Sequence, residues 1–397
     1  MSFPYNLINI YLCDLNQLFV IYKSVILHKI LQMSTSNFNP VKFVPSDKNS
    51  FSNTLNKKVN EYFKSNNISK TGDYRIWIKV IVMPILYLLP FSLILSNLFS
   101  NNFLIYYGLW VLMGIGLAGC GLGIMHDACH GAISKNKSVN NFIGFVINLA
   151  GGYALNWKIQ HNVLHHSYTN IADYDEDIDT SGIMRFSPHQ PLKPFFKYQI
   201  FYAWFFYGLM TFFWSTYKDF AQLTRYKNKG LLKTQGAKYE IELVKLILLK
   251  CLYYSFFVVL PLVFVDLSWI HFLFGWFSMH FTAGLILACI FQSAHVVPSS
   301  EYPLPDENNL IGNELAIHQL QTTANFAPKN RILSWYIGGL NYQIEHHLFP
   351  TMSHIHHRQV SKIVESTALE FGLPYNSQRT FLIALRNHAK MLLSLSK

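Results

Sequence analysis

Long apolar runs separated by polar segments dominate the chain from residue 76 onward. Four of these runs are long enough to cross a bilayer as helices, for which about 20 apolar residues are needed. Short polar gaps separate the first run from the second and the third from the fourth, so the pattern predicts two helical hairpins. The predicted spans are Trp77–Leu98, Phe103–Met125, Leu246–Leu267 and Trp269–Phe291.

A fifth apolar run, Phe195–Tyr217, is crowded with aromatic residues and contains Lys197. Such a composition favours the lipid–water interface, where we place it. If it spanned, the histidine-rich segments before and after it would lie on opposite membrane faces. Residues 141–155 are apolar but too short to span, so we expect them at the interface or in the core.

Four spans put both chain ends on one side of the membrane. The two turns predicted on the other side, Phe99–Asn102 and Asp266–Ser268, contain no Lys or Arg. Because cytoplasmic segments carry the excess of Lys and Arg, we expect the chain ends and the histidine-rich segments in the cytosol.

Residues 1–75 are predicted to be an N-terminal segment and a polar linker, and residues 76–397 the membrane domain. Residues 3–32 are apolar but interrupted by Asp14 and Lys23, and they lack the basic start of a signal peptide. Two interpretations stay open: an amphipathic segment on the membrane surface, or a start codon placed upstream of Met33.

Composition agrees with a membrane protein. Hydrophobic residues make up 51% and charged residues 13% of the chain, against about 25% charged residues in soluble domains. The net charge is +11. Most Lys and Arg residues lie outside the apolar runs, as expected for the positive flanks of membrane spans, and do not indicate nucleic-acid binding. The five cysteines show no CxxC spacing, and we expect all of them to be reduced.

Glycines recur in the second apolar run. A nucleotide-binding loop is a poor interpretation, because no strand precedes them. Small residues that let two helices approach closely in lipid explain them better. They are Gly114, Gly116, Gly119, Gly121 and Gly123.

Three groups of histidines and one lone histidine are predicted at the cytosolic membrane face. In the first two groups a pair is spaced i, i+4, which puts both imidazoles on one face of a helix. The third group is an adjacent pair with a glutamine one turn earlier. The residues are His126 and His130; His161, His165 and His166; His346 and His347 with Gln343; and the lone His295.

The histidine groups indicate a metal centre. One i, i+4 pair is often a plain surface feature, but eight imidazoles on converging helix ends would bury many polar nitrogens that need partners. A metal supplies such a partner, and neutral imidazole suits iron, zinc, copper or nickel. Eight donors exceed the needs of one ion, so two metals are implied.

Other polar residues near these groups have simpler interpretations. His354, His356 and His357 open a polar helix and are expected on a solvated face. The acidic run from residue 173 to residue 179 is expected to be a solvated loop, or else to bind the outer nitrogens of metal-ligating histidines. Asp127 and Glu345 are available for the same task.

The boxes HDACH, HNVLHH and QIEHH, in this order and with two hydrophobic hairpins around them, resemble those of the membrane fatty-acid desaturases. The segments HHSYTNIADYDEDID and GGLNYQIEHHLFPTMSHIHH extend the resemblance, which covers roughly residues 76–375. The glutamine that opens the third box resembles the front-end subgroup, which inserts a double bond between an existing one and the carboxyl end. The resemblance implies an all-α membrane protein with four transmembrane helices in two hairpins and a cytosolic helical cap that holds a di-iron site.

The resemblance also implies the ligands and the partners. Gln343 stands where other desaturases have a ligating histidine. Many front-end members carry a fused cytochrome b5 with an HPGG motif; this sequence has no such motif, and His28 is its only histidine before residue 126. A separate electron donor is therefore expected, either cytochrome b5 with its reductase or a ferredoxin, at the endoplasmic reticulum membrane. The implied iron ligands are His126, His130, His161, His165, His166, His295, His346 and His347, with Gln343.

Desaturation needs an oxidant that no side chain supplies, which non-haem iron and O₂ provide. The acyl chain, carried by CoA or by a phospholipid, is expected in a bent apolar tunnel. Trp157 and Tyr342 are candidate lining residues, with ordinary packing as the alternative. His318 is either a lining residue or a residue that contacts the metal ligands from outside. A sphingolipid desaturase or an acyl hydroxylase could use the same site. A non-enzymatic metal-binding membrane protein is the alternative of another class, although the spans lack the ionisable residues of a transport path.

Overall fold

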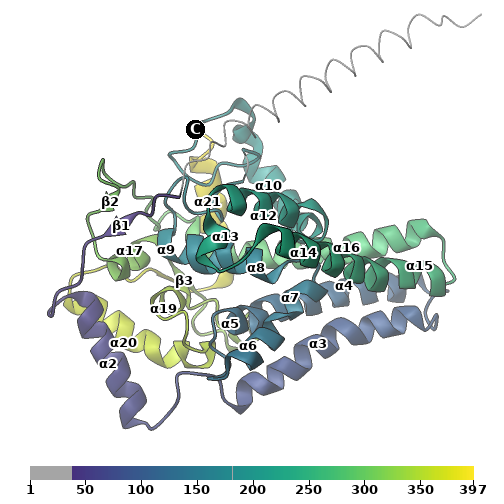
Figure 1. Ribbon diagram of the computed structural model, residues 1–397, viewed down its shortest axis with the longest axis horizontal. Coiled ribbons are helices and arrows are strands. Elements are labelled where there is room, and N and C mark those ends of the chain that lie inside the picture. Colours follow the sequence, from purple (N-terminus) through teal and green to yellow (C-terminus); the bar gives the residue numbers. More distant parts are fainter. Residues whose placement is uncertain (1–37, 181) are drawn as a thin grey trace, which may run out of the picture. The chain divides into compact units, whose positions relative to one another are not determined.

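The computed structural model describes residues 38–180 and 182–397, and these residues are mostly helical (Figure 1). The expectations for residues 3–32, including those for Cys13 and His28, lie outside the described part. The described residues form two compact units: a small one of residues 38–39 and 221–243, and a large one of residues 40–220 and 244–397.

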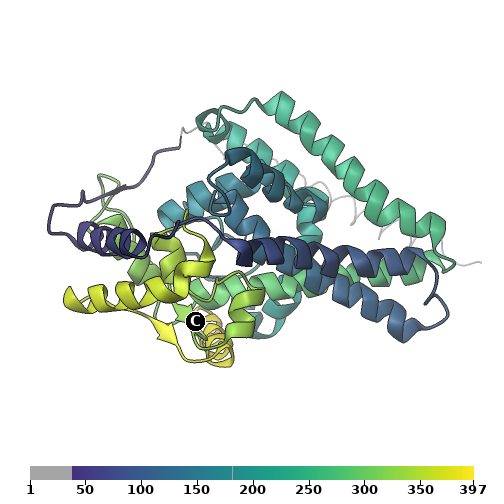
Figure 2. The same cartoon turned by 90° about the horizontal axis from the view of Figure 1, so that it is seen from below.

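Among the described residues, four helices are long and apolar enough to cross a membrane, and they agree with the four predicted spans. The second and third each contain a π-helical turn, so each consists of two α-helices in line. In both views of the large unit, α3 and α16 extend away from the end where α2 and α20 lie (Figures 1 and 2). The spans are Tyr74–Leu95 (α3), Phe103–Cys129 (α4, Phe103–Cys120, and α5, His126–Cys129), Tyr239–Phe264 (α14, Tyr239–Tyr254, and α15, Leu260–Phe264) and Trp269–His295 (α16).

The first span begins and ends earlier than its apolar run, for local reasons. The Asp73 side chain accepts a hydrogen bond from the Arg75 N–H, so the helix begins at Tyr74, before the first tryptophan. At the other end Asn97 has a φ of 60°. That left-handed conformation ends the helix before Leu98.

Glycines in α4 allow the spans to touch. A Cβ atom at Gly116 would lie 2.5 Å from the backbone of Leu86 and Tyr87 in α3. A Cβ atom at Gly114 would lie 2.5 Å from the Met279 carbonyl oxygen in α16. The interpretation of the glycine run as a helix-packing surface is therefore confirmed.

The aromatic run that was expected not to span is broken into short pieces, none of which is long enough to cross a bilayer. Its helix α10 packs against α16, where Gly208 leaves room for the Phe281 ring. Residues 137–158 also form short helices. These elements are the 3₁₀ turn Pro194–Tyr198, α10 (Gln199–Gly208), α11 (Met210–Phe213), the π-helical turn Trp214–Lys218, α6 (Lys137–Gly144), α7 (Val146–Leu149) and α8 (Ala154–Lys158).

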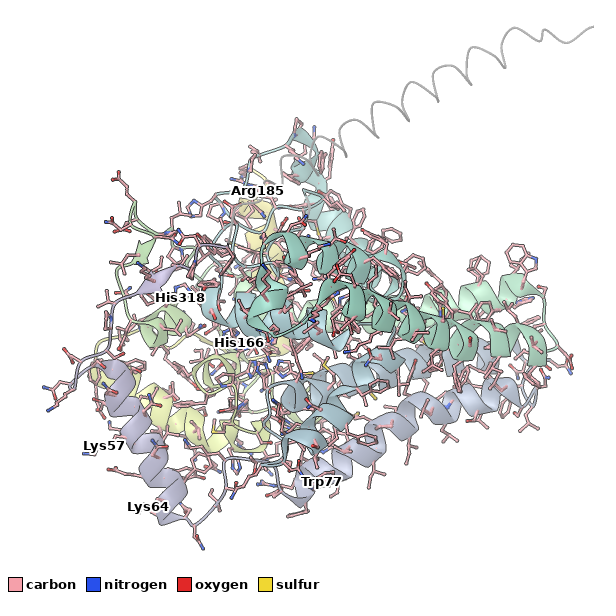
Figure 3. All side chains as sticks on the ribbon, viewed as in Figure 1. Lys57, Lys64, Trp77, His166, Arg185 and His318 are labelled. Atoms are coloured by element: carbon pink, nitrogen blue, oxygen red, sulfur yellow. The ribbon has the colours of Figure 1, made fainter. Side chains whose placement is uncertain are left out.

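The polar stretch before the first span contains a helix, α2 (Phe51–Ser65), within the predicted linker. Its apolar residues recur every four positions and pack on α20 (His357–Glu370), as in the contact of Val59 with the cluster around Val360. Lys57 and Lys64 project from the opposite face (Figure 3). The division of the chain at residue 75 stays a prediction.

The remaining elements of the large unit are short. Two parallel pairs of two-residue strands join distant parts of the chain, with Lys42 opposite Leu310 and Asn325 opposite Ser377. The elements are β1 (Lys42–Phe43), β2 (Leu310–Ile311), β3 (Asn325–Phe326), β4 (Ser377–Gln378), α9 (His166–Tyr168), α17 (Leu315–Thr322), α18 (Arg331–Tyr336), α19 (Gln343–Leu348), the 3₁₀ turn His354–His356 and α21 (Phe381–Ser394).

The small unit contains most of α12 (Asp219–Asn228), α13 (Leu231–Thr234) and the first residues of α14. Lys227 joins the helices α12 and α14, because its Nζ lies 4.1 Å from the centre of the Tyr239 ring and 3.8 Å from the Glu240 carboxylate.

Candidate metal centre

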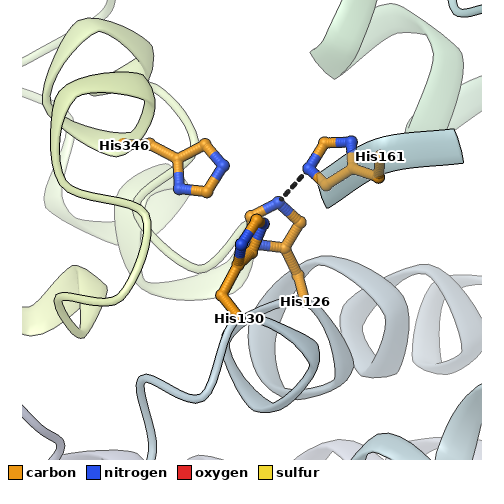
Figure 4. Close-up of side chains that lie close together, drawn as sticks. All are labelled: His126, His130, His161 and His346. Carbon is orange, nitrogen blue, oxygen red and sulfur yellow. Dashed lines mark hydrogen bonds between the residues drawn. The ribbon is translucent and has the colours of Figure 1, made fainter. Parts of the chain in front are cut away.

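The first histidine cluster joins three segments that are distant in sequence. His126 begins α5 and His130 follows its last residue, while His161 lies in the π-helical turn Ile159–His165 and His346 on α19. One nitrogen from each ring lies within 4.8 Å of those of the other three, and all four side chains are buried. They point toward one another in Figure 4, where His126 Nε2 and His161 Nε2 are 3.0 Å apart.

His166 adds a fifth imidazole to this first cluster. Its Nε2 lies 3.2 Å from His161 Nε2 and 2.9 Å from His346 Nε2. In Figure 3 His166 lies in the interior of the large unit.

The second cluster consists of His165, His295 and His347, again with one nitrogen of each within 4.8 Å of the others. His295 is the last residue of the fourth span. The Gln343 amide nitrogen lies 3.0 Å from His295 Nε2, and its Oε1 is buried without a hydrogen-bond partner. All nine residues predicted from the sequence are thus brought together around two neighbouring clusters, although their role as ligands stays a prediction.

π-Helical turns distribute the histidines between the clusters. The turn Gly121–Met125 directly precedes His126, and the turn Ile159–His165 contains two of the histidines. Such turns are rare and occur frequently at functional sites. In the wider turn His161 shares the first cluster with His166, five residues on, while His165 joins the second cluster. The predicted i, i+4 pairing holds in both groups, since the ring centres of His126 and His130 are 4.8 Å apart and those of His161 and His165 are 5.2 Å apart, but the second pair is divided between the two clusters.

Buried nitrogens without partners show that these residues fit a metal. The Nε2 atoms of His130, His165 and His347 are inaccessible to solvent and have no hydrogen-bond partner within residues 38–180 and 182–397. A buried polar atom without a partner costs about 1–3 kcal/mol. His126 Nε2 and His161 Nε2 are 3.0 Å apart, close enough for both to bind one ion.

Burial also keeps most of the imidazoles neutral, as metal ligation requires. Burial lowers the pKa of His161 well below its usual range, and the neighbouring imidazoles lower it further. The same two causes lower the pKa values of His130, His166, His346 and His347. Neutral rings leave a lone pair free for an ion.

His165 is held by carboxylates on its outer side. Burial alone would lower its pKa, but the charges of Asp175 and Asp177 raise the pKa to about 9. His165 Nδ1 lies 3.1 Å from both oxygens of Asp175, which is itself buried. Of the two interpretations of the acidic run, the structure supports contact with a predicted metal ligand for Asp175, because this carboxylate occupies His165 Nδ1 while Nε2 has no hydrogen-bond partner among the described residues.

Gln319 holds the outer nitrogen of His347, another member of the second cluster. Its Oε1 lies 2.8 Å from His347 Nδ1, and its amide nitrogen donates to the His166 carbonyl oxygen over 2.6 Å. Sequence reasoning missed this residue. Nothing in the local pattern of α17 distinguishes it from a plain core residue, because the contact exists only in the folded chain.

The expectation that His354, His356 and His357 lie on a solvated face is wrong, because all three are buried. His354 Nδ1–H donates to Asp127 Oδ2 over 2.8 Å, and Lys79 Nζ donates to His354 Nε2 over 2.6 Å. Asp127 lies 4.0 Å from His126 Nδ1 on its other side. A chain of polar contacts therefore connects the first span to the first cluster, which a one-dimensional polarity pattern could not reveal.

Glu345, the other carboxylate that was considered for the outer nitrogens, contacts no histidine of the clusters. It accepts hydrogen bonds from the Asn325 amide over 2.9 Å and from the Tyr375 hydroxyl over 2.9 Å. Burial raises its pKa to about 7. It ties α19 to β3 and to the segment that precedes β4.

The three candidate lining residues lie in different places. The Trp157 ring lies 4.5 Å from that of His161 and lines a cavity of about 160 Å³ together with His165 and Phe291. Tyr342 instead donates to the Pro328 carbonyl oxygen over 2.6 Å and lines a different pocket. His318 packs against the Phe43 ring and belongs to neither histidine cluster.

Comparison with known proteins agrees with this site. The model of the family described as fatty acid desaturase matches residues 101–379. The chain is 33% identical to an sn-1 linoleoyl-lipid 6-desaturase of Synechocystis, over 90% of this chain and 98% of the relative. It is 32% identical to the protein of the same description from Arthrospira platensis, over 87% and 92%, and 32% identical to an acyl-lipid (8-3)-desaturase of Physcomitrium patens, over 88% and 72%.

Proposed function

Because the chain belongs to the fatty acid desaturase family and is therefore an oxidoreductase, we propose that it is a front-end desaturase of polyunsaturated acyl chains. The overall reaction takes two hydrogens from adjacent methylene groups and reduces O₂ to two waters with two further electrons and two protons. Gln343, at the opening of the third box, supports the front-end position. Two relatives that are described as sn-1 linoleoyl-lipid 6-desaturases also support the front-end position.

We assign the two histidine clusters to two iron ions. His126, His130, His161, His166 and His346 would hold one ion, and His165, His295 and His347, with Gln343 beside them, would hold the other. Bound iron would supply, with O₂, the oxidant that an unactivated C–H bond requires. The observation that carries the proposal is the convergence of eight buried imidazoles, several with inner nitrogens that lack any partner.

The protein itself has to position the acyl chain and exclude water. The cavity beside the second cluster reaches His165 and has an apolar part, which includes Trp157, Met210 and Phe291, and a polar part, which includes Glu176 and Asp177. We propose that an acyl segment lies there with two methylene groups facing the clusters. Asp175 and Gln319 fix the rings of His165 and His347, so that the donors keep one orientation during the reaction.

We further propose that the clusters face the cytosol at the endoplasmic reticulum membrane and that residues 76–397 form the catalytic domain. A separate carrier, cytochrome b5 with its reductase or a ferredoxin, would then deliver electrons from the cytosolic side. The turns between the paired spans carry no Lys or Arg, which supports this orientation.

Expression in yeast supplied with linoleic or α-linolenic acid tests the activity. We expect a new fatty acid that is two hydrogens lighter, with its added double bond on the carboxyl side of the existing ones. His165→Ala should abolish it, whereas His189→Ala should not, because His189 is exposed and its ring bonds only to the Tyr302 carbonyl oxygen among the described residues. A product that gains one oxygen would instead establish a hydroxylase. An iron-loaded protein without any product would favour a non-catalytic metal-binding role.

A further inference from the structure

A second pocket, of about 190 Å³, is lined by positive charges and by no acidic residue. Its cationic side chains are Arg75 and Lys79 from the first two turns of α3, Arg331 from α18 and Arg358 from α20. It lies outside both histidine clusters and takes no part in the function proposed above.

The charges in this pocket are only partly balanced by the protein. Asp73 binds Arg75 with contacts of 2.8 and 3.1 Å. In residues 38–180 and 182–397, by contrast, the guanidinium groups of Arg331 and Arg358 have no hydrogen bond and no ion pair. Two guanidinium groups that face one concave pocket without a counter-ion repel each other, and a bound anion would remove that repulsion.

Lys79 adds a buried donor at the inner end of the pocket. Its side chain is only 2% exposed, and its Nζ donates to His354 Nε2 and lies 5.6 Å from the centre of the Trp335 ring. An ammonium group has three N–H donors. The described residues supply a hydrogen-bond acceptor for one of them, so the others are available to a ligand.

Arginine forks indicate which anion suits the pocket. Guanidinium groups bind phosphate oxygens in pairs, with two parallel hydrogen bonds, and prefer phosphate to smaller anions for that reason. The other walls, which include Trp335, Tyr342 and Pro328, are apolar or amphipathic. They suit a ligand that carries a hydrocarbon part beside its charge.

The position of the pocket favours a ligand from the membrane. Arg75 and Lys79 are one turn apart at the very start of the first span, and positive residues at such a place lie at the level of lipid headgroups. We propose that this pocket binds a phosphate ester at the membrane surface, such as the headgroup of a glycerophospholipid. The phosphates of an acyl-CoA have the same chemistry and are the other source to be distinguished.

Binding of short-chain lipids to the purified full-length protein in detergent tests the proposal. We expect dioctanoyl phosphatidic acid to bind and dioctanoylglycerol, which lacks the phosphate, to bind at least tenfold more weakly. The double variant Arg331→Gln/Arg358→Gln should lose at least tenfold in affinity for phosphatidic acid. Both arginines are exposed, so the fold should survive, and an unchanged thermal unfolding temperature would verify it.

Arg386→Gln is the matched control, because Arg386 is exposed on α21 and does not line the pocket. It should bind phosphatidic acid like the wild type, which separates the pocket from a general attraction of anions to a basic protein. If CoA displaces phosphatidic acid from the wild type but not from the double variant, the phosphate site is supported. Acyl-CoA is then a source of the bound phosphate. Equal binding of the two lipids, or undiminished binding by the double variant, would overturn the proposal. So would a double variant that binds lipid normally but no longer accepts electrons from its donor protein.

Discussion

At the scale of single residues, the candidate centre consists of buried imidazoles, some of which have their outer nitrogens held in place. His165 and His347 show this arrangement most clearly, since Asp175 and Gln319 occupy their Nδ1 atoms and leave Nε2 without a partner. A carboxylate on the outer nitrogen fixes the ring and makes the inner nitrogen a stronger donor. Asp175 should therefore matter almost as much as a ligand.

Replacing Asp175 with Asn tests this role. The variant keeps the shape of the side chain but loses the charge that holds His165, so we expect iron affinity to fall by about 10- to 100-fold. Iron titration of the purified protein, followed by its absorption spectrum, measures the change. Asp173→Asn is the control, since Asp173 is exposed and its φ of 69° suits Asn equally well. Equal iron affinity of the two variants would contradict the assignment.

The sequence identified the histidines of the three boxes because their spacing and their place beside the spans can be read along the chain. It did not identify Gln319, and it predicted a solvent-exposed position for His354, which is buried. Both residues contact partners more than a hundred positions away, Gln319 at His166 and His354 at Asp127. Local polarity carries no information about such partners.

At the scale of elements, close contact between helices positions the first cluster. Gly116 lets α4 approach the backbone of α3 near Leu86, and α4 leads through a π-helical turn to His126. The first histidine pair therefore depends on how tightly these spans pack. Helix pairs in lipid rely on such small residues, because lipid tails compete for every other apolar contact.

Gly116→Ala should destabilise the folded protein by about 1–3 kcal/mol, because the added methyl group overlaps the α3 backbone. Gly108→Ala lies on the same helix with no atom within 4 Å of the added Cβ. That control should be neutral, or more stable by up to about 1 kcal/mol. Thermal or denaturant unfolding in detergent compares the two. A stable Gly116→Ala variant would show that the spans do not pack as described.

The buried His388 on helix α21 should make the free energy of unfolding depend on pH. His388 Nδ1–H donates to the Val296 carbonyl oxygen over 2.8 Å, and the Tyr207 hydroxyl donates to its Nε2 over 2.7 Å. Burial lowers its pKa to about 4. An unfolded histidine, with a pKa near 6.5, takes up a proton that the folded one excludes. The stabilisation is therefore complete above about pH 6.5 and is lost as the pH falls toward about 4.

The unfolding free energies of wild type and His388→Gln, measured at pH 7.5 and pH 4.5, isolate this contribution. The advantage of the wild type should shrink on acidification, by at most about 3 kcal/mol. Other buried histidines titrate in both proteins alike, so the difference between the two proteins reports His388. If the difference in unfolding free energy between wild type and variant stays constant or grows at low pH, the predicted direction of the pH dependence is wrong.

Hydropathy predicted the existence and order of the spans, since length and composition suffice for that. The ends of the spans and the π-helical turns were not predicted. The ends depend on caps such as Asp73, and a π-helical turn leaves no mark in a pattern of apolar residues. For that reason the division of His161 and His165 between two clusters was beyond a sequence argument that assumed regular α-helices.

At the scale of the whole molecule, the chain is an integral membrane protein with four candidate spans, and the histidine clusters lie at one end of the hairpins. The cationic pocket and the cavity beside the second cluster both combine elements from distant parts of the sequence. Neither could be predicted from the chain alone, because each exists only where separate segments meet.

The proposed orientation predicts which surfaces a membrane-impermeant thiol reagent reaches. In sealed microsomes Lys57→Cys, on the outward face of α2, should react readily (Figure 3). Ser100→Cys, in the turn between α3 and α4, should react only after the membrane is permeabilised. The wild-type protein gives the background of its own cysteines. The opposite pattern would place the histidine clusters in the lumen.

The claim on which everything else depends is that the two clusters hold iron in the folded protein. Metal analysis of the purified, full-length protein tests it most directly. We expect about two iron ions per chain, and a loss of iron in His130→Ala and in His347→Ala but not in His189→Ala. Protein that is folded yet contains no stoichiometric iron, or cluster variants that retain all of it, would contradict the account.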